Sequence, residues 1–137
     1  MLMDLANNFS GLVSFSAYFG SSIFLLVAFA FIYSHVTPYR EFTLIAAGND
    51  AAAYSLSGAI VGFALPLASA VSHSVDLGDM VLWGVVALLV QILTFLTVRL
   101  IFPKIVADIP ANKVSKGIFL GAVSIAVGIL NAACMTY

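Results

Sequence analysis

Four stretches of this 137-residue chain are long enough to cross a lipid bilayer and carry no charged side chain in their interior. They cover residues 14–36, 51–73, 80–98 with Arg99 directly after, and 117–137. A transmembrane helix needs about 20 apolar residues, and in hydrocarbon each backbone amide must be paired within its own helix or within a closed barrel. Barrel strands alternate polar and apolar residues, and these stretches do not. The sequence therefore predicts an all-α integral membrane protein.

The composition leaves little chain for anything outside the bilayer. Hydrophobic residues make up 63% of the sequence, compared with about 45–50% in soluble domains. We expect a single membrane domain over residues 1–137, with spans at about 14–36, 51–73, 79–102 and 115–136. Side chains that can accept hydrogen bonds from first-turn amides stand near three expected helix starts: Ser14, Asn49 with Asp50, and Asp79.

The basic residues predict the orientation, because Lys and Arg in short loops are retained on the cytoplasmic side. Arg40 lies between the first two spans, and the other four flank the connection between the last two spans: Arg99, Lys104, Lys113 and Lys116. The remaining loop and both tails have none. We therefore expect both termini on the periplasmic or extracellular side, an N-out and C-out arrangement.

The two expected cytoplasmic connections share a plan. Each begins with a proline, Pro38 or Pro103, and each reaches an asparagine, Asn49 or Asn112, before a helix rich in small residues. The asparagines align at an offset of 63 residues, as do several small residues after them. Apolar residues at helical spacing predict a short helix in the headgroup plane within each connection: Tyr39, Phe42 and Ile45, then Ile105 and Ile109. We predict two tandem helical hairpins, residues 14–73 and 79–137, related as a parallel repeat.

Small residues recur every three or four positions on one face of the second and fourth spans. The pairs Gly58/Gly62 and Gly117/Gly121 have the spacing that lets helix backbones approach closely in lipid, and Gly128 continues the second series. These faces predict either a packed interior or an oligomer interface. The first span is expected to face lipid with its phenylalanines: Phe15, Phe19, Phe24, Phe29 and Phe31.

A few uncharged polar features lie within the spans. Pro66 removes an amide and so frees the carbonyl of Gly62. Asn131 stands at nearly the same depth, where it can bond this carbonyl, line a polar cavity or pair with a neighbouring subunit, and Gln91 has the same options. Both amides therefore predict either helix–helix contacts or a polar pathway. Cys134 is expected to be buried among small residues.

The residues for catalysis or cofactor chemistry are not arranged in any familiar pattern. His35 and His73 fall at opposite membrane faces, and Glu41 and the aspartates fall in loops or at interfaces. We expect no catalytic, cofactor or metal site. Five basic residues and a net charge of −1 also argue against nucleic-acid binding. Since no span holds a group that titrates near neutral pH, any transport is expected not to be proton-coupled.

Several stretches are specific enough to indicate a family. They include Phe-Ile-Tyr-Ser-His-Val-Thr-Pro ending at Pro38, Pro-Leu-Ala-Ser-Ala ending at Ala70, and Asn-Ala-Ala-Cys-Met-Thr beginning at Asn131. Along nearly its whole length the chain resembles the YjfL-like family of bacterial inner-membrane proteins, which are built on the domain of unknown function 350. The resemblance implies a small protein of the inner (plasma) membrane, with no established activity or catalytic residues. Members tend to be encoded near phage-shock-like and flotillin-like membrane-stress proteins, which are the partners that the resemblance implies.

Two functions fit these observations. The first is a non-enzymatic, homo-oligomeric component of the lipid bilayer that works with partner proteins in envelope maintenance. The alternative is a small channel or transporter whose uncharged path passes Gln91, Pro66 and Asn131. A channel requires a continuous polar lining, whereas a scaffold requires only packed faces.

The predicted orientation can be tested at Cys134, the one cysteine of the chain. We expect a membrane-impermeant thiol reagent to label it, after mild denaturation, in intact cells with a permeabilised outer membrane. Labelling that requires inside-out vesicles would reverse the orientation.

Overall fold

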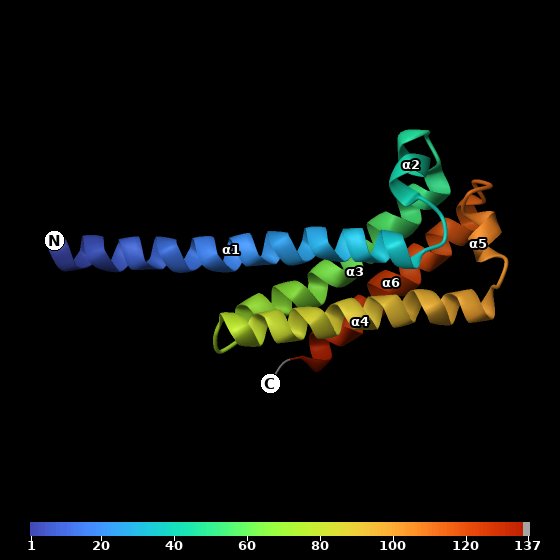
Figure 1. The fold of residues 1–137 in the computed structure, drawn as a ribbon. Coiled ribbons are helices and arrows are strands. Elements are labelled where there is room, and N and C mark those ends of the chain that lie inside the picture. The colour runs from blue at the N-terminus through green and yellow to red at the C-terminus, as the bar shows by residue number, and fades with distance from the viewer. Residues whose placement is uncertain (136–137) are drawn as a thin grey trace.

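The computed structural model describes residues 1–135 and contains only helices and their connections there (Figure 1). Four helices are long and apolar enough to cross a membrane. The all-α membrane architecture predicted from the sequence is thus confirmed. In chain order the helices are α1 (Leu2–Val36), α2 (Glu41–Ala46), α3 (Asp50–His73), α4 (Leu77–Ile101), α5 (Ile105–Asp108) and α6 (Val114–Cys134). The last residue of the expected fourth span, 136, lies outside the described residues.

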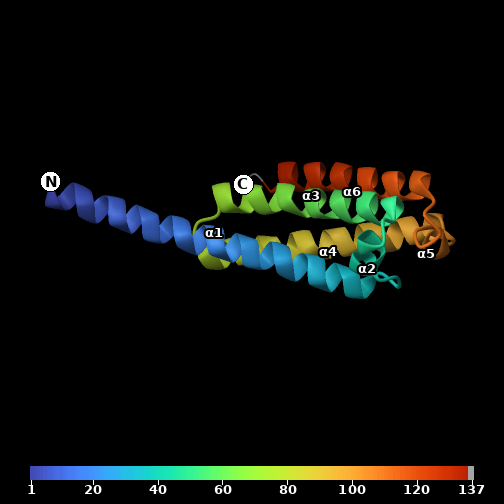
Figure 2. The same cartoon turned by 90° about the horizontal axis from the view of Figure 1, so that it is seen from above.

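The long helices form two layers. Figure 2 shows α3 and α6 side by side, with α1 and α4 beneath them. The short helices α2 and α5 lie together at one end of the bundle, and the chain begins at the other end (Figure 1). The connections that contain α2 and α5 carry Arg40, Lys104 and Lys113, so positive charge gathers at their end of the bundle.

The first helix begins twelve residues earlier than the sequence predicted. Ser14 was expected near its start, but α1 runs unbroken for 35 residues from Leu2, and Ser14 lies inside it. No proline precedes Pro38, so nothing interrupts the backbone hydrogen bonds. The bundle reaches only as far as Tyr18, which packs near Met80 at the start of α4. Residues 2–17 are all exposed and project beyond the bundle as a free helical arm (Figure 1).

Helix α4 also begins earlier than predicted. Its N-cap is Asp76, whose side chain accepts a hydrogen bond from the Asp79 amide at 2.8 Å. Asp79 was expected to cap the helix itself. Its carboxylate instead reaches back to the Val75 amide at 3.1 Å, so the two aspartates act together as in a capping box.

Asn49 begins α3 as predicted, and it also ties α3 to the second connection. Its side-chain oxygen caps the Ala52 amide at 2.8 Å. Its side-chain nitrogen donates to the carbonyls of Ile109 and Pro110 at 3.0 and 3.2 Å. The buried side chain of Asn49 therefore joins the start of α3 to the connection that precedes α6.

Asn112 makes the reciprocal contact, because its side-chain oxygen accepts from the Ala51 amide in the first turn of α3 at 3.0 Å. Asn112 has a positive φ of 58°, a conformation that asparagine tolerates better than most residues. It does not cap its own helix, since the N-cap of α6 is Lys113, which makes no side-chain cap bond. Both asparagines thus serve the same helix end.

The phenylalanines of α1 do not all face outward. Phe29 is fully buried and stacks on Phe63 of α3, with ring centroids 4.4 Å apart. The prediction that it faces lipid was wrong, because it lies on the side of α1 that crosses α3. The other four phenylalanines of this set are more than half exposed: Phe15, Phe19, Phe24 and Phe31.

The two short helices bury more apolar surface than an interfacial position would suggest. Ile105 and Ile109 are fully buried at the end of the bundle, and Tyr39 is nearly so. Phe42, by contrast, is 53% exposed. The short helices therefore close the bundle end and do not merely lie flat beside it.

We expect Asn49→Ala to lower the free energy of unfolding by about 1–3 kcal/mol, because it removes a helix cap and leaves two carbonyls without their donor. Asn8→Ala is the matched control, since Asn8 is exposed on the arm, and it should change stability by less than about 0.5 kcal/mol. Thermal unfolding in one detergent measures both. Equal midpoints would show that the link between the connections contributes nothing.

Candidate functional site

The backbones of α3 and α6 approach each other closely at their glycines. A Cβ atom placed on Gly58 would lie 2.6 Å from the carbonyl carbon of Gly121, and one on Gly121 would lie 2.6 Å from the carbonyl oxygen of Tyr54. Real Cβ contacts are essentially never shorter than 3.0 Å. Glycine at both positions therefore allows the two backbones to touch.

The same contact continues toward both ends of α3. Gly117 lies against the backbone of Ala51, and Gly128 lies against the backbone of Gly62. Near the end of α3 the Ser69 hydroxyl donates to the carbonyl of Ala132, 63 residues further along the chain, at 3.3 Å. These contacts advance along both helices in the same direction, so α3 and α6 are parallel. We call the whole contact the glycine seam.

The proline within α3 contributes to this seam. Pro66 is buried and α3 continues through it, so the carbonyl of Gly62 lacks its usual helical donor. That carbonyl oxygen occupies the place that a side chain on Gly128 would take. The freed carbonyl thus rests against the Cα of Gly128, where a weak Cα–H contact is the available partner.

Gln91 of α4 contacts the glycine seam. It is fully buried, and its side-chain nitrogen donates to the carbonyl of Ser124 at 3.0 Å. A Cβ on Gly62 would lie 2.8 Å from the same nitrogen. Gln91 therefore joins α4 to the α3–α6 pair at the turn that precedes Pro66.

Asn131 does not join this group through any hydrogen bond within residues 1–135. Its side-chain nitrogen is buried without a partner there. Gln91 therefore lies against Gly62, one turn before Pro66, whereas Asn131 makes no hydrogen bond to either residue within residues 1–135. Cys134 is exposed, so the prediction that it packs in the interior was wrong; it lies in the last turn of α6, beyond the glycine seam.

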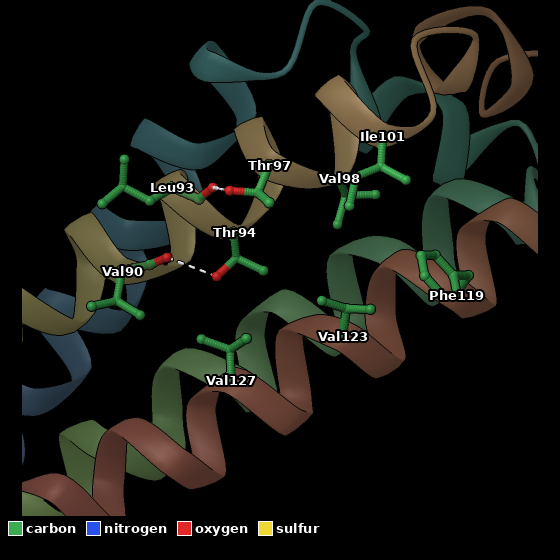
Figure 3. A pocket seen from close by; sticks show the side chains of 9 residues that line it. All are labelled: Val90, Leu93, Thr94, Thr97, Val98, Ile101, Phe119, Val123 and Val127. Carbon is green, nitrogen blue, oxygen red and sulfur yellow. Dashed lines mark hydrogen bonds between the residues drawn. The ribbon is translucent and has the colours of Figure 1, made fainter.

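An apolar groove of about 310 Å³ runs between α4 and α6 (Figure 3). Its two polar residues, Thr94 and Thr97, turn their hydroxyls back onto the carbonyls of Val90 and Leu93, each at 2.8 Å. The remaining lining side chains are apolar. The groove suits an acyl chain better than a polar solute, since it presents no unpaired donor to orient one.

Sequence reasoning missed a group of buried polar side chains at the α2 end of the bundle. Glu41, the first residue of α2, is only 1% exposed. One of its carboxylate oxygens accepts from the Thr37 hydroxyl at 2.5 Å, and the other is buried without a partner among the described residues. The Tyr33 hydroxyl is likewise buried and unpartnered there, and the buried Tyr39 hydroxyl has the Ser55 side chain as a neighbour. A cavity of about 510 Å³, lined by residues of the last turn of α1, the α1–α2 connection and α2, adjoins this carboxyl.

Burial at the α2 end of the bundle raises the pKa of Glu41 and of Tyr39. Burial raises the pKa of Glu41 from 4.5 to about 7, and the Thr37 hydrogen bond opposes that rise. Burial and the charge of Glu41 raise the pKa of the Tyr39 phenol. A carboxyl with a pKa near 7 can exchange a proton under physiological conditions. The sequence could not reveal this, because a glutamate in a six-residue helix after a proline has the pattern of an exposed loop residue.

Comparison with known proteins settles the family. The family described as Domain of Unknown Function (DUF350) matches residues 7–135 of the chain. The chain belongs to this family. The match includes the glycine seam, Gln91 and Glu41, so these three features lie in the family's domain. The family predicted from the sequence is thereby confirmed.

The relatives are themselves membrane proteins. The UPF0719 inner membrane protein YjfL of Escherichia coli (strain K12) is 41% identical over 126 residues, which are 92% of this chain and 96% of that protein. The UPF0719 transmembrane protein YshE of Bacillus subtilis (strain 168) is 28% identical over 97 residues, 71% of this chain and 72% of that protein. No solved structure matches the chain. The relatives and the four apolar helices support a multi-pass location in the inner membrane.

We expect Gly62→Ala to destabilise the protein by about 1–3 kcal/mol, because the new methyl group meets the Ser124 backbone, which cannot move away cheaply. Gly20→Ala is the matched control: it is also a glycine inside a long helix, but nothing lies within 4 Å of its added Cβ. The stability of the Gly20→Ala variant should equal that of the wild type or be slightly higher. Detergent unfolding of both variants decides the matter, and equal loss in the two would argue against the seam as the packed centre.

Proposed function

We propose that this protein is a non-enzymatic, homo-oligomeric component of the bacterial inner membrane that serves envelope maintenance. The observation that carries the proposal is the projecting arm of α1, whose apolar face is not covered by its own chain. The proposal includes the N-out, C-out orientation and the two tandem hairpins. Positive charge at the α2 and α5 end supports the orientation, and the parallel seam between α3 and α6 supports the repeat.

The arm is amphipathic. At about 1.5 Å per residue, residues 2–17 extend about 24 Å past the bundle. Leu2, Leu5, Phe9 and Leu12 are 80, 57, 69 and 60% exposed and follow one another at steps of three, four and three residues. This spacing places them on one face, as in the core positions of a coiled coil. The opposite face carries Asp4, Asn7, Gly11 and Ser14.

A second copy of the arm suits this face better than the membrane surface does. Helices that lie in the headgroup region are typically rich in Lys and Arg on their polar side. The arm has no basic residue, and it carries Asp4. Arms from two or more copies can cover one another's apolar faces, while the polar faces, which carry Asp4, stay in water. We therefore propose that the copies associate through their arms.

The interior of the protomer supports a packing role over transport. The side-chain nitrogen of Gln91 donates a hydrogen bond to the Ser124 carbonyl. The glycine seam brings the backbones of α3 and α6 into contact at the place where a path past Pro66 would run. The groove between α4 and α6 is apolar. A channel requires a continuous polar lining, so these contacts favour a non-transporting component. The link to phage-shock-like and flotillin-like partners rests on the family resemblance alone.

Cross-linking tests the arm contact. In a Cys134→Ser background we expect Leu5→Cys to form disulfide-linked dimers when membranes are mildly oxidised. Asn7→Cys is the matched control, because it lies on the opposite face of the same helical stretch and should remain largely monomeric. Equal cross-linking of the two, or none in either, would remove the support for an oligomer built through the arms.

Function is tested in cells and in liposomes. Cells that lack the gene should become more sensitive to membrane-disrupting agents, and a Leu5→Asp, Leu12→Asp double variant should not restore resistance, although the wild-type chain does. Purified protein in liposomes should leave an ion or pH gradient intact. A saturable flux that disappears in Gln91→Leu would replace this proposal with the channel or transporter.

A further inference from the structure

We propose that Glu41 is a proton-binding site reached from the α2 end of the bundle, and that the bound proton holds α2 in place against α3. This proposal goes beyond the assembly role above and does not depend on it. It concerns a titratable group that neither the glycine seam nor the arm uses.

The geometry of Glu41 requires its charge to be balanced. The side chain is almost completely buried, and within residues 1–135 no basic group forms an ion pair with it. An unpaired carboxylate away from water is strongly disfavoured, so the group takes up a proton instead. Thr37 satisfies one oxygen. The second oxygen is the one available to carry the proton.

The phenols of Tyr33 and Tyr39 suit either state of this carboxyl. The Tyr33 hydroxyl is buried without a partner in the described chain, the buried Tyr39 hydroxyl has the Ser55 side chain as a neighbour, and both phenols interact electrostatically with Glu41. A phenol O–H can donate to a carboxylate, and a phenol oxygen can accept from a protonated carboxyl. The proton comes from water through the adjoining cavity and returns there, and no other bond changes.

Charged groups near the site do not remove the need for a proton. His35 and Arg40 line the same cavity, but both side chains are exposed. In α3, against which α2 packs, the charged residue of the first turn is Asp50, which is also exposed. In α4, Phe95 packs on both phenols, and the nearby Arg99 is exposed. Solvent therefore screens these charges from Glu41.

The pH dependence follows from the direction of the shift. When α2 is docked, burial gives Glu41 a pKa of about 7, compared with 4.5 for an ordinary glutamate. The proton favours docking fully below pH 4.5, and this contribution is lost as the pH rises through about 7, because the docked carboxyl then loses its proton and leaves a buried charge. Alkaline conditions at the α2 end should loosen α2, and acidic conditions should hold it.

The chain permits a direct test, because Glu41 is its one glutamate. The full chain, labelled with ¹³C at the glutamate side-chain carboxyl and placed in lipid nanodiscs, gives a single carboxyl signal to follow by NMR as the pH changes. We expect half-titration near pH 7. A midpoint below about pH 5.5 would mean an ordinary, solvated carboxyl and would overturn the proposal.

Two variants test the geometry around the carboxyl. Thr37→Val removes the hydroxyl that stabilises the charged form and should raise the midpoint, whereas Thr37→Ser keeps a hydroxyl and should leave it nearly unchanged. An unchanged midpoint in Thr37→Val would contradict the placement of the carboxyl.

The titration should also be the same in sodium and in choline buffers. A midpoint that falls when sodium is present would identify an alkali-cation site in place of a proton site.

The effect on α2 is measured by amide hydrogen exchange of residues 40–47 in the wild type and in Glu41→Gln. Comparing the two at each pH cancels the intrinsic pH dependence of exchange, and Gln resembles the protonated carboxyl. We expect the ratio of wild-type to variant rates to rise about tenfold between pH 6 and pH 8. A constant ratio would show that the proton does not control the docking of α2. Asp50→Asn, an exposed carboxyl near the same helices, should behave as the wild type.

Discussion

The direct contact between the backbones of α3 and α6 is the interaction on which the rest of the bundle depends. Lipid tails are as apolar as leucine, so helices in a membrane gain little from burying large side chains and gain more from close backbone packing. Glycine at five positions of the seam makes that approach possible. Once the two helices are joined in parallel, the positions of Gln91, Pro66 and the two connection asparagines follow from it.

Polar groups in this bundle are used mainly to fasten helices together. Gln91 bonds a carbonyl of α6, and Asn49 and Asn112 bond across the two connections. Gln91 lies within a membrane-spanning helix, where no water is present to pair the carbonyl that it bonds. Glu41 differs from these groups, because it is buried at the bundle end with one oxygen unpartnered in the described chain and without a balancing cation. A carboxyl can gain or lose a proton, whereas the side-chain amides of Gln91, Asn49 and Asn112 do not ionise and only form hydrogen bonds between helices.

The protein consists of a packed bundle, joined by the seam, and a projecting arm whose apolar side chains are exposed. Within the bundle, the glycines of α3 and α6 join these two helices to each other. The arm of α1 leaves an apolar stripe uncovered. An uncovered arm is what the proposed assembly requires, and the proposed proton site at Glu41 lies at the opposite end of the bundle.

The sequence by itself determined the class of the protein, the number of apolar helices, the family and the start of α3 at Asn49. Uncharged runs of bilayer length leave the backbone no alternative to helices. It did not determine where α1 begins or that Phe29 faces α3, because helix ends and facing sides depend on which helices lie alongside. Spacing indicated that Gly58 and Gly121 could permit close contact, but whether that contact joined helices or subunits was left open. Only the tertiary structure decided that the contact lies within one chain and that Glu41 is buried, because burial depends on the side chains that surround a residue and not on its neighbours in sequence.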